Sequence, residues 1–122
     1  MDSSKRRSWV EVDLGALERN AAQIARRSGK PLIPMIKADA YGLGAVPVAK
    51  ALARQPVWAL GVATVAEAEE LRASGIEGRV LIFSPLLPWD FEAVRAARAT
   101  PNLGDPGTIE RWIESGGGPW HL

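Results

Sequence analysis

The sequence predicts an α/β protein in which helices cover a parallel sheet. Short apolar segments alternate with segments that repeat apolar residues at helical spacing. The strand-like segments end at residues 37, 62, 83 and 103, so their ends lie 25, 21 and 20 residues apart. That spacing accommodates one helix and its loops in each repeat. It therefore favours βα units, arranged either in an open doubly wound sheet or in a barrel.

The first half of the chain contains two strand candidates, each followed by a helix. Residues 9–12 alternate apolar and polar side chains, as a half-buried strand does, and Asp13 is suited to cap the next helix. Residues 32–36 are apolar throughout, which is typical of a strand covered on both faces, and that strand ends at Lys37. Pro47 fits the first turn of the second helix. The inner face of the first helix is expected to carry Leu14, Leu17, Ala21 and Ile24.

Three further strand candidates follow at residues 58–62, 80–83 and 100–103. Between the first two, Thr64 and Glu67 have the spacing of a capping box, in which each side chain accepts a hydrogen bond from the other residue's backbone amide. The sequence therefore predicts that a helix begins directly after Thr64.

The last two helices are expected to begin at aspartates. Asp90 is suited to cap one of them, and Asp105 followed by Pro106 is a favourable pair for the start of the other. The inward faces are expected to carry Phe91, Val94 and Ala97 in one helix and Ile109, Trp112 and Ile113 in the other. Residues 119–122 then begin another apolar segment.

Composition excludes several classes of protein. The 122 residues carry 15 Lys and Arg against 14 Asp and Glu, so the net charge of +1 creates no field that would attract nucleic acid or an anionic membrane. The absence of Cys and the single His disfavour a metal site. No apolar run approaches the ~20 residues of a membrane span. We expect a cytoplasmic protein with a disordered tail at residues 1–8 and one domain at residues 9–122.

Lys37 is the residue on which we expect the chemistry to depend. It follows a buried strand and precedes small residues and a glycine-rich turn, and ligands of α/β folds bind at that end of the sheet. Partial desolvation would disfavour its ammonium form and leave a free amine that attacks an aldehyde cofactor. A lysine in this place is more commonly the first solvated residue of a loop, so the local pattern alone leaves both interpretations open.

Residues 37–44 read K-A-D-A-Y-G-L-G, which resembles the lysine motif of alanine racemases, K-A-[ND]-A-Y-G-H-G in many members. Residues 9–14, W-V-E-V-D-L, resemble the opening of that family, and residues 61–68 and 80–83 also fit it. The resemblance extends over nearly the whole chain from residue 9 onward. Leu43 departs from the pattern, because many relatives carry His there and leucine cannot donate a hydrogen bond.

The resemblance implies a (β/α)8 barrel of fold type III that binds pyridoxal 5'-phosphate (PLP). A chain of this length would hold about four βα units of such a barrel, which needs ~250 residues. Lys37 would hold PLP as a Schiff base and act as one of two bases that interconvert L-alanine and D-alanine, while Tyr41 would bind the cofactor phosphate. The second base would be a tyrosine outside these residues, supplied across a homodimer. The implied use is D-alanine for cell-wall peptidoglycan.

Three other interpretations stay open. Gly42 and Gly44 begin like a dinucleotide-binding G-x-G-x-x-G loop, but Pro47 occupies the place of the third glycine and no acidic residue follows before Glu67. A PLP-binding regulatory or carrier barrel, or a racemase for serine, lysine or a broad range of amino acids, would share much of the pattern. These 122 residues alone are expected to be inactive, because half a barrel exposes strand edges and part of its core.

Structural roles are preferred for the remaining aromatic and polar candidates. Core positions are expected for Trp58, Trp112 and Trp120. Trp89 could face a partner, and His121 is expected to be a hydrogen-bonded core residue. Ser84 follows a strand but has no histidine or acid near it in the sequence, so we assign it no role.

Overall fold

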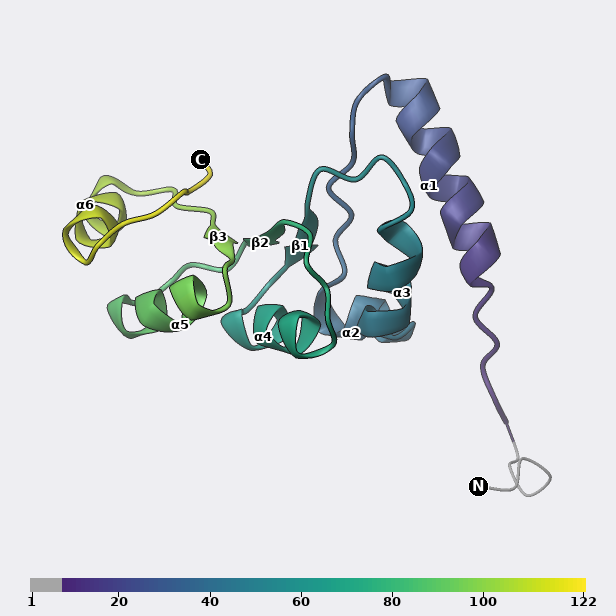
Figure 1. Cartoon of the computed structure of the whole chain (residues 1–122), viewed down its shortest axis with the longest axis horizontal. Coiled ribbons are helices and arrows are strands. Elements are labelled where there is room, and N and C mark those ends of the chain that lie inside the picture. The colour runs from purple at the N-terminus through teal and green to yellow at the C-terminus, as the bar shows by residue number, and fades with distance from the viewer. Residues whose placement is uncertain (1–7) are drawn as a thin grey trace.

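The computed structural model describes residues 8–122 and shows an α/β arrangement in which α2, α4 and α5 line one side of a short sheet (Figure 1). The elements in chain order are α1 (Leu14–Ser28), α2 (Lys37–Gly42), α3 (Ala45–Leu52), β1 (Leu60–Val62), α4 (Val65–Ala73), β2 (Val80–Ile82), the 3-10 helix η2 (Pro88–Asp90), α5 (Phe91–Ala96), β3 (Thr100–Pro101) and α6 (Pro106–Glu114). The predicted fold class is confirmed. Residues 1–7, most of the tail predicted at 1–8, lie outside the described part.

The strands are parallel and lie side by side in chain order. β1 pairs with β2 and β2 with β3, with Leu60 opposite Val80 in the first pair. Isolated parallel bridges extend the series at both edges, because residues 32–36 pair with β1 and the segment around it, and His121 pairs with Asn102. All the predicted strand segments from residue 32 onward therefore take part in one sheet.

The strand order distinguishes a barrel from a doubly wound sheet. A doubly wound sheet reverses its strand order at a switch point, whereas a barrel adds each new strand beside the preceding one. The described strands follow the chain order without reversal. The chain therefore forms part of a barrel.

The core lies where the middle strands meet the helices. Every residue of β1 and β2 is buried. Trp112 of α6 is 1% exposed and packs edge to face on Phe91, with ring centroids 5.2 Å apart. Its predicted core position is confirmed. Trp58 and Trp120 are 40% and 38% exposed, so that prediction is wrong for them, because they lie at sheet ends that the described residues leave uncovered.

Helix α1 begins and ends as the sequence predicts. Asp13 accepts a first-turn backbone amide at 2.9 Å, and Gly29 ends the helix with a φ of 65°. Ala21 and Ala25 are buried, but Ile24 is 56% exposed, because its side of α1 faces an apolar groove that the described residues leave open. Neither α1 nor any other helix within residues 8–122 is long and apolar enough to cross a bilayer.

The strand predicted at residues 9–12 is not formed. These residues have no regular secondary structure, and Trp9 and Val10 are 69% and 82% exposed. An alternating pattern becomes a strand only beside a partner strand that supplies hydrogen bonds, and the segments of residues 8–122 pair elsewhere. The alternating pattern at residues 9–12 thus has no partner strand within residues 8–122.

The two aspartates predicted to cap the last two helices behave differently. Asp105 accepts the Thr108 amide at 2.8 Å and caps α6, as predicted. Asp90 does not cap α5, because its backbone is already helical, and its carboxylate instead accepts the Leu87 amide at 2.9 Å and closes η2. Ile113 is 60% exposed rather than inward, because α6 buries only the side that carries Trp112.

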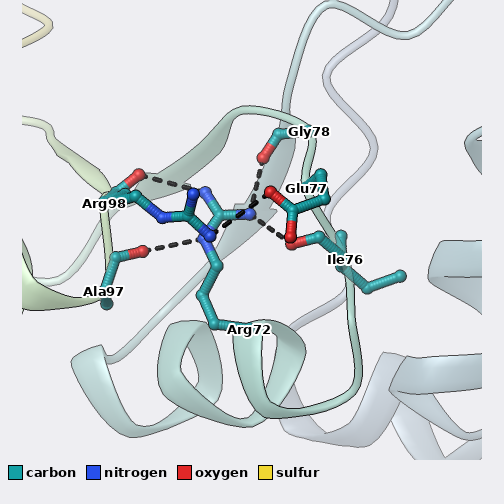
Figure 2. Close-up of polar contacts among 6 residues, drawn as sticks. All are labelled: Arg72, Ile76, Glu77, Gly78, Ala97 and Arg98. Atoms are coloured by element: carbon teal, nitrogen blue, oxygen red, sulfur yellow. Dashed lines mark hydrogen bonds and ion pairs between the residues drawn. The ribbon is translucent and has the colours of Figure 1, made fainter.

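An arginine fastens the carboxyl end of α4 to two loops (Figure 2). The Arg72 guanidinium donates to the carbonyls of Ile76 and Gly78 in the loop that follows α4. It also donates to the carbonyls of Ala97 and Arg98 between α5 and β3, at 2.8 and 3.0 Å. Four carbonyls that no strand or helix satisfies are thus collected by one planar side chain.

Candidate active site

Lys37 lies at the carboxyl end of the first parallel segment, where the sequence predicts it. Ile36, the preceding residue, is 2% exposed, and its amide donates to the Gly61 carbonyl at 2.8 Å. A Cβ on Gly61 would clash with the Sδ of Met35, so glycine is what allows the first segment to lie close against β1. The backbone on both sides of Lys37 is therefore fixed by the sheet.

The chain takes a left-handed turn immediately after Lys37. Residues 38–41 all have φ between 51° and 57° and ψ between 35° and 52°. Each residue in this conformation costs roughly 1–2 kcal/mol if it is not glycine. Gly42 and Gly44 continue with φ of 85° and 92°. The sequence does not indicate this turn, because alanines favour right-handed helices and no glycine precedes position 42 within it.

Hydrogen bonds at both ends hold the turn in this conformation. The Ala40 amide donates to the Ile36 carbonyl at 2.9 Å. Asp39 accepts twice: its carbonyl takes the Gly44 amide at 2.9 Å, and its carboxylate takes the Ala45 amide at 2.6 Å, at the start of α3. These hydrogen bonds fix the strained backbone of the turn, as is typical of turns at functional sites.

Glu67 connects this turn to the end of β1. Its Oε1 accepts the Ala38 amide at 2.7 Å, 29 positions away in the sequence. Its Oε2 accepts the amides of Ala63 and Thr64 at 2.7 and 3.1 Å, and its own amide donates to the Thr64 hydroxyl at 3.3 Å. The predicted capping box is confirmed, but the bond to Ala38 was not predicted.

The environment of Glu67 favours its ionised form. Partial burial of the carboxyl raises its pKa, but the three backbone amides and the nearby Lys37 ammonium outweigh burial. The pKa of Glu67 therefore lies below its usual range. A negative charge faces the root of the Lys37 side chain at neutral pH.

The two predicted site residues lie together on α2 and open to solvent. Lys37 is exposed, so the desolvation that the sequence led us to expect is not provided by the described residues. The Tyr41 ring, four positions later, is 64% exposed. An amine and a phenol thus lie at the carboxyl ends of the strands, the end at which ligands of barrels bind.

The remaining candidates lie outside this arrangement. Leu43 lines the apolar groove beside α1 and offers no polar atom to α2. Ser84 only donates its backbone amide to the Ala63 carbonyl. His121 is not the hydrogen-bonded core residue that we expected, because its Nδ1 is buried without a partner within residues 8–122, as is the Oδ1 of Asn102. Nothing in the sequence signals these two orphaned atoms.

A comparison with protein families identifies one match over most of the chain. The sequence model described as "Alanine racemase, N-terminal domain" matches residues 12–119. Curated relatives include an alanine racemase of Methylacidiphilum infernorum, 43% identical over 84 residues, which are 67% of this chain and 22% of that protein. Another is an alanine racemase of Nostoc sp., 38% identical over 103 residues, or 82% of this chain and 27% of that protein.

Solved structures give the same result. Alanine racemase from Bacillus anthracis with bound L-Ala-P is 31% identical with a TM-score of 0.80, covering 89% of this chain and 29% of the other. Alanine racemase from Corynebacterium glutamicum is 33% identical with a TM-score of 0.77, covering 85% of this chain and 31% of the other. The chain spans less than a third of the length of these relatives.

Proposed function

We propose that this chain, which belongs to the family of alanine racemase N-terminal domains, supplies the cofactor lysine of a PLP-dependent enzyme. That enzyme would interconvert L-alanine and D-alanine. Alanine racemases depend on PLP. The observation that carries the proposal is the place of Lys37, one residue beyond a buried parallel strand and directly before a strained turn. Fixed backbone and an open side chain are what a covalent cofactor lysine needs.

The chemistry of the donor groups fits this cofactor. The Lys37 amine is a nucleophile of the kind that joins an aldehyde, and its exposure leaves room for one. The Tyr41 hydroxyl can donate to a phosphate oxygen, and Tyr41 is the single tyrosine in the 122 residues. When bound, PLP withdraws electrons from the substrate and so makes the α-proton removable.

In the proposed reaction, Lys37 has two tasks. Its Nζ would hold the cofactor and would remove or return the α-proton of the substrate on one face. Inversion needs a second base on the opposite face. Because the only tyrosine of the chain is assigned to the phosphate, we propose that a tyrosine outside these residues, from the other subunit of a homodimer, is that base. We further propose a cytoplasmic enzyme whose D-alanine enters peptidoglycan.

The test uses the protein as its gene encodes it, incubated with PLP and L-alanine. D-alanine should form, and borohydride reduction followed by peptide mapping should give a pyridoxyl adduct on Lys37, one of four lysines in the sequence. Lys37→Ala should abolish both the adduct and turnover, whereas Lys50→Ala, an exposed lysine on α3, should change neither. An adduct on another lysine contradicts the proposal. An adduct on Lys37 without turnover favours a PLP carrier, and turnover of other amino acids favours a broader racemase.

A further inference from the structure

The carboxylate of Glu67 does more than a capping box requires. A capping glutamate needs only the amide of the N-cap residue, here Thr64. Glu67 divides its two oxygens between two loops, with Oε1 on Ala38 after the first parallel segment and Oε2 on Ala63 and Thr64 after β1. One side chain therefore joins the carboxyl ends of two neighbouring strands.

The bond to Ala38 acts at the point where Lys37 leaves the sheet. The Ala38 amide is part of the peptide unit that follows the Lys37 Cα, and residue 38 is the first of the four left-handed residues in this turn. Fixing that amide fixes the direction in which the chain leaves Lys37. It also fixes the direction from which the lysine side chain starts.

We propose that Glu67 is a positioning residue for Lys37, and that its carboxylate, by accepting the Ala38 amide, orients the lysine toward an aldehyde ligand. This inference rests on the proposed function only for the identity of that ligand. The hydrogen bond from the Ala38 amide to Glu67 does not depend on the ligand, so it is tested separately.

Two substitutions of Glu67 separate its bond to Ala38 from its bonds to the loop after β1. A carboxylate offers acceptors on both oxygens, whereas a glutamine has one acceptor oxygen and one NH2 donor. Glu67→Gln can therefore serve only one loop. Its oxygen should stay on the two amides of Ala63 and Thr64, so that its NH2 group would face the Ala38 N–H. Glu67→Asp keeps the charge but is one methylene shorter, so it should stay on Thr64 and fail to reach Ala38.

The first measurement is amide hydrogen exchange, resolved at Ala38, in the full chain without cofactor. Both Glu67→Gln and Glu67→Asp should reduce the protection of Ala38 about tenfold, the factor expected for losing a hydrogen bond to a charged acceptor. Thr64→Ala removes the hydroxyl of the box but leaves the carboxylate on Ala38, so it should leave that protection unchanged. Asp105→Ala is a matched helix-cap control far along the chain.

The second measurement is the rate at which added PLP is trapped on Lys37 by borohydride, followed across pH. The two Glu67 variants should slow trapping about tenfold and change its pH profile, while Thr64→Ala and Asp105→Ala should not. Equal slowing in Thr64→Ala, or unchanged trapping and protection in the Glu67 variants, overturns the inference. If the unmodified protein gives no adduct on Lys37, the proposed function fails, and exchange at Ala38 still decides whether Glu67 holds the turn.

Discussion

The two ends of helix α4 carry side chains of opposite charge, and each of them forms hydrogen bonds to the backbone of neighbouring loops. At its amino end, Glu67 accepts three backbone amides, and at its carboxyl end, Arg72 donates to four backbone carbonyls. Both signs also suit the helix dipole, with the acid near the positive end and the base near the negative end. Helix α4 is thus bonded to loops at both the carboxyl ends and the amino ends of the strands.

The difference lies in which loops each end holds. Arg72 connects α4 to loops with no candidate catalytic residue, at the amino ends of β2 and β3 (Figure 2). Glu67 reaches back to the residue after Lys37, at the carboxyl ends of the strands. In barrels, the amino-terminal side maintains stability and the carboxyl-terminal side performs chemistry. We therefore expect changes at Arg72 to affect mainly the free energy of unfolding, and changes at Glu67 to affect the site and, by a smaller amount, the free energy of unfolding.

The largest effect is expected from Arg72→Ala. The variant would leave four carbonyls without their donor, two of them in part-buried hydrogen bonds, and we expect the free energy of unfolding to fall by about 3 kcal/mol. Urea denaturation of the full chain measures this value. Arg27→Ala is the control, because Arg27 is an exposed arginine in the last turn of α1. An equal loss in both variants would mean that the carbonyls around Arg72 find other partners.

A smaller, pH-dependent effect is expected from Glu67→Gln. Because folding lowers the pKa of Glu67, its ionised form stabilises the fold above the unfolded value of about 4.5, and that contribution disappears as the pH falls through the lower, folded value. We expect the variant to lose about 1–2 kcal/mol at pH 7 and to approach the parent protein in acid. Denaturation at several pH values tests this, and a gap that widens on acidification contradicts it.

The smallest change in the free energy of unfolding is expected from glycine substitutions, which we compare in a left-handed and a right-handed helical turn. Ala38→Gly relieves left-handed strain but adds freedom to the unfolded chain, so we expect a net gain of about 0.5–1 kcal/mol in the free energy of unfolding. Ala66→Gly in the right-handed α4 should lose about 1 kcal/mol instead. Thermal unfolding of both variants gives the two signs. Losses in both would argue against a left-handed turn at Ala38.

Local patterns were sufficient to predict most of the fold. Strand spacing predicts the βα units, and the caps at Asp13, Thr64 and Asp105 are found where the sequence places them. The location of Lys37 at a strand end also follows from an apolar run that stops at a charge. These features depend on neighbours within a few residues, which a sequence displays directly.

The features that the sequence did not reveal depend on distant residues or on missing surroundings. The hydrogen bond from the Ala38 amide to Glu67 joins positions 29 apart, and nothing in a capping box indicates that its glutamate accepts a further amide from a distant loop. The exposure of Lys37 and of residues 9–12 depends on how much of a barrel encloses them. Periodicity reports which side of an element is apolar, but not whether anything covers that side.

The backward-wound path after Lys37 restricts which side chains its residues can carry. β-branched residues are genuine outliers at positive φ, whereas aspartate is several-fold enriched there and alanine is small enough to be tolerated. The letters A-D-A between Lys37 and Tyr41 therefore record the shape of the main chain rather than contacts with a ligand. Within residues 37–41, the side chains that we propose to meet the cofactor are those of Lys37 and Tyr41, and the three residues between them are restricted by the main-chain conformation.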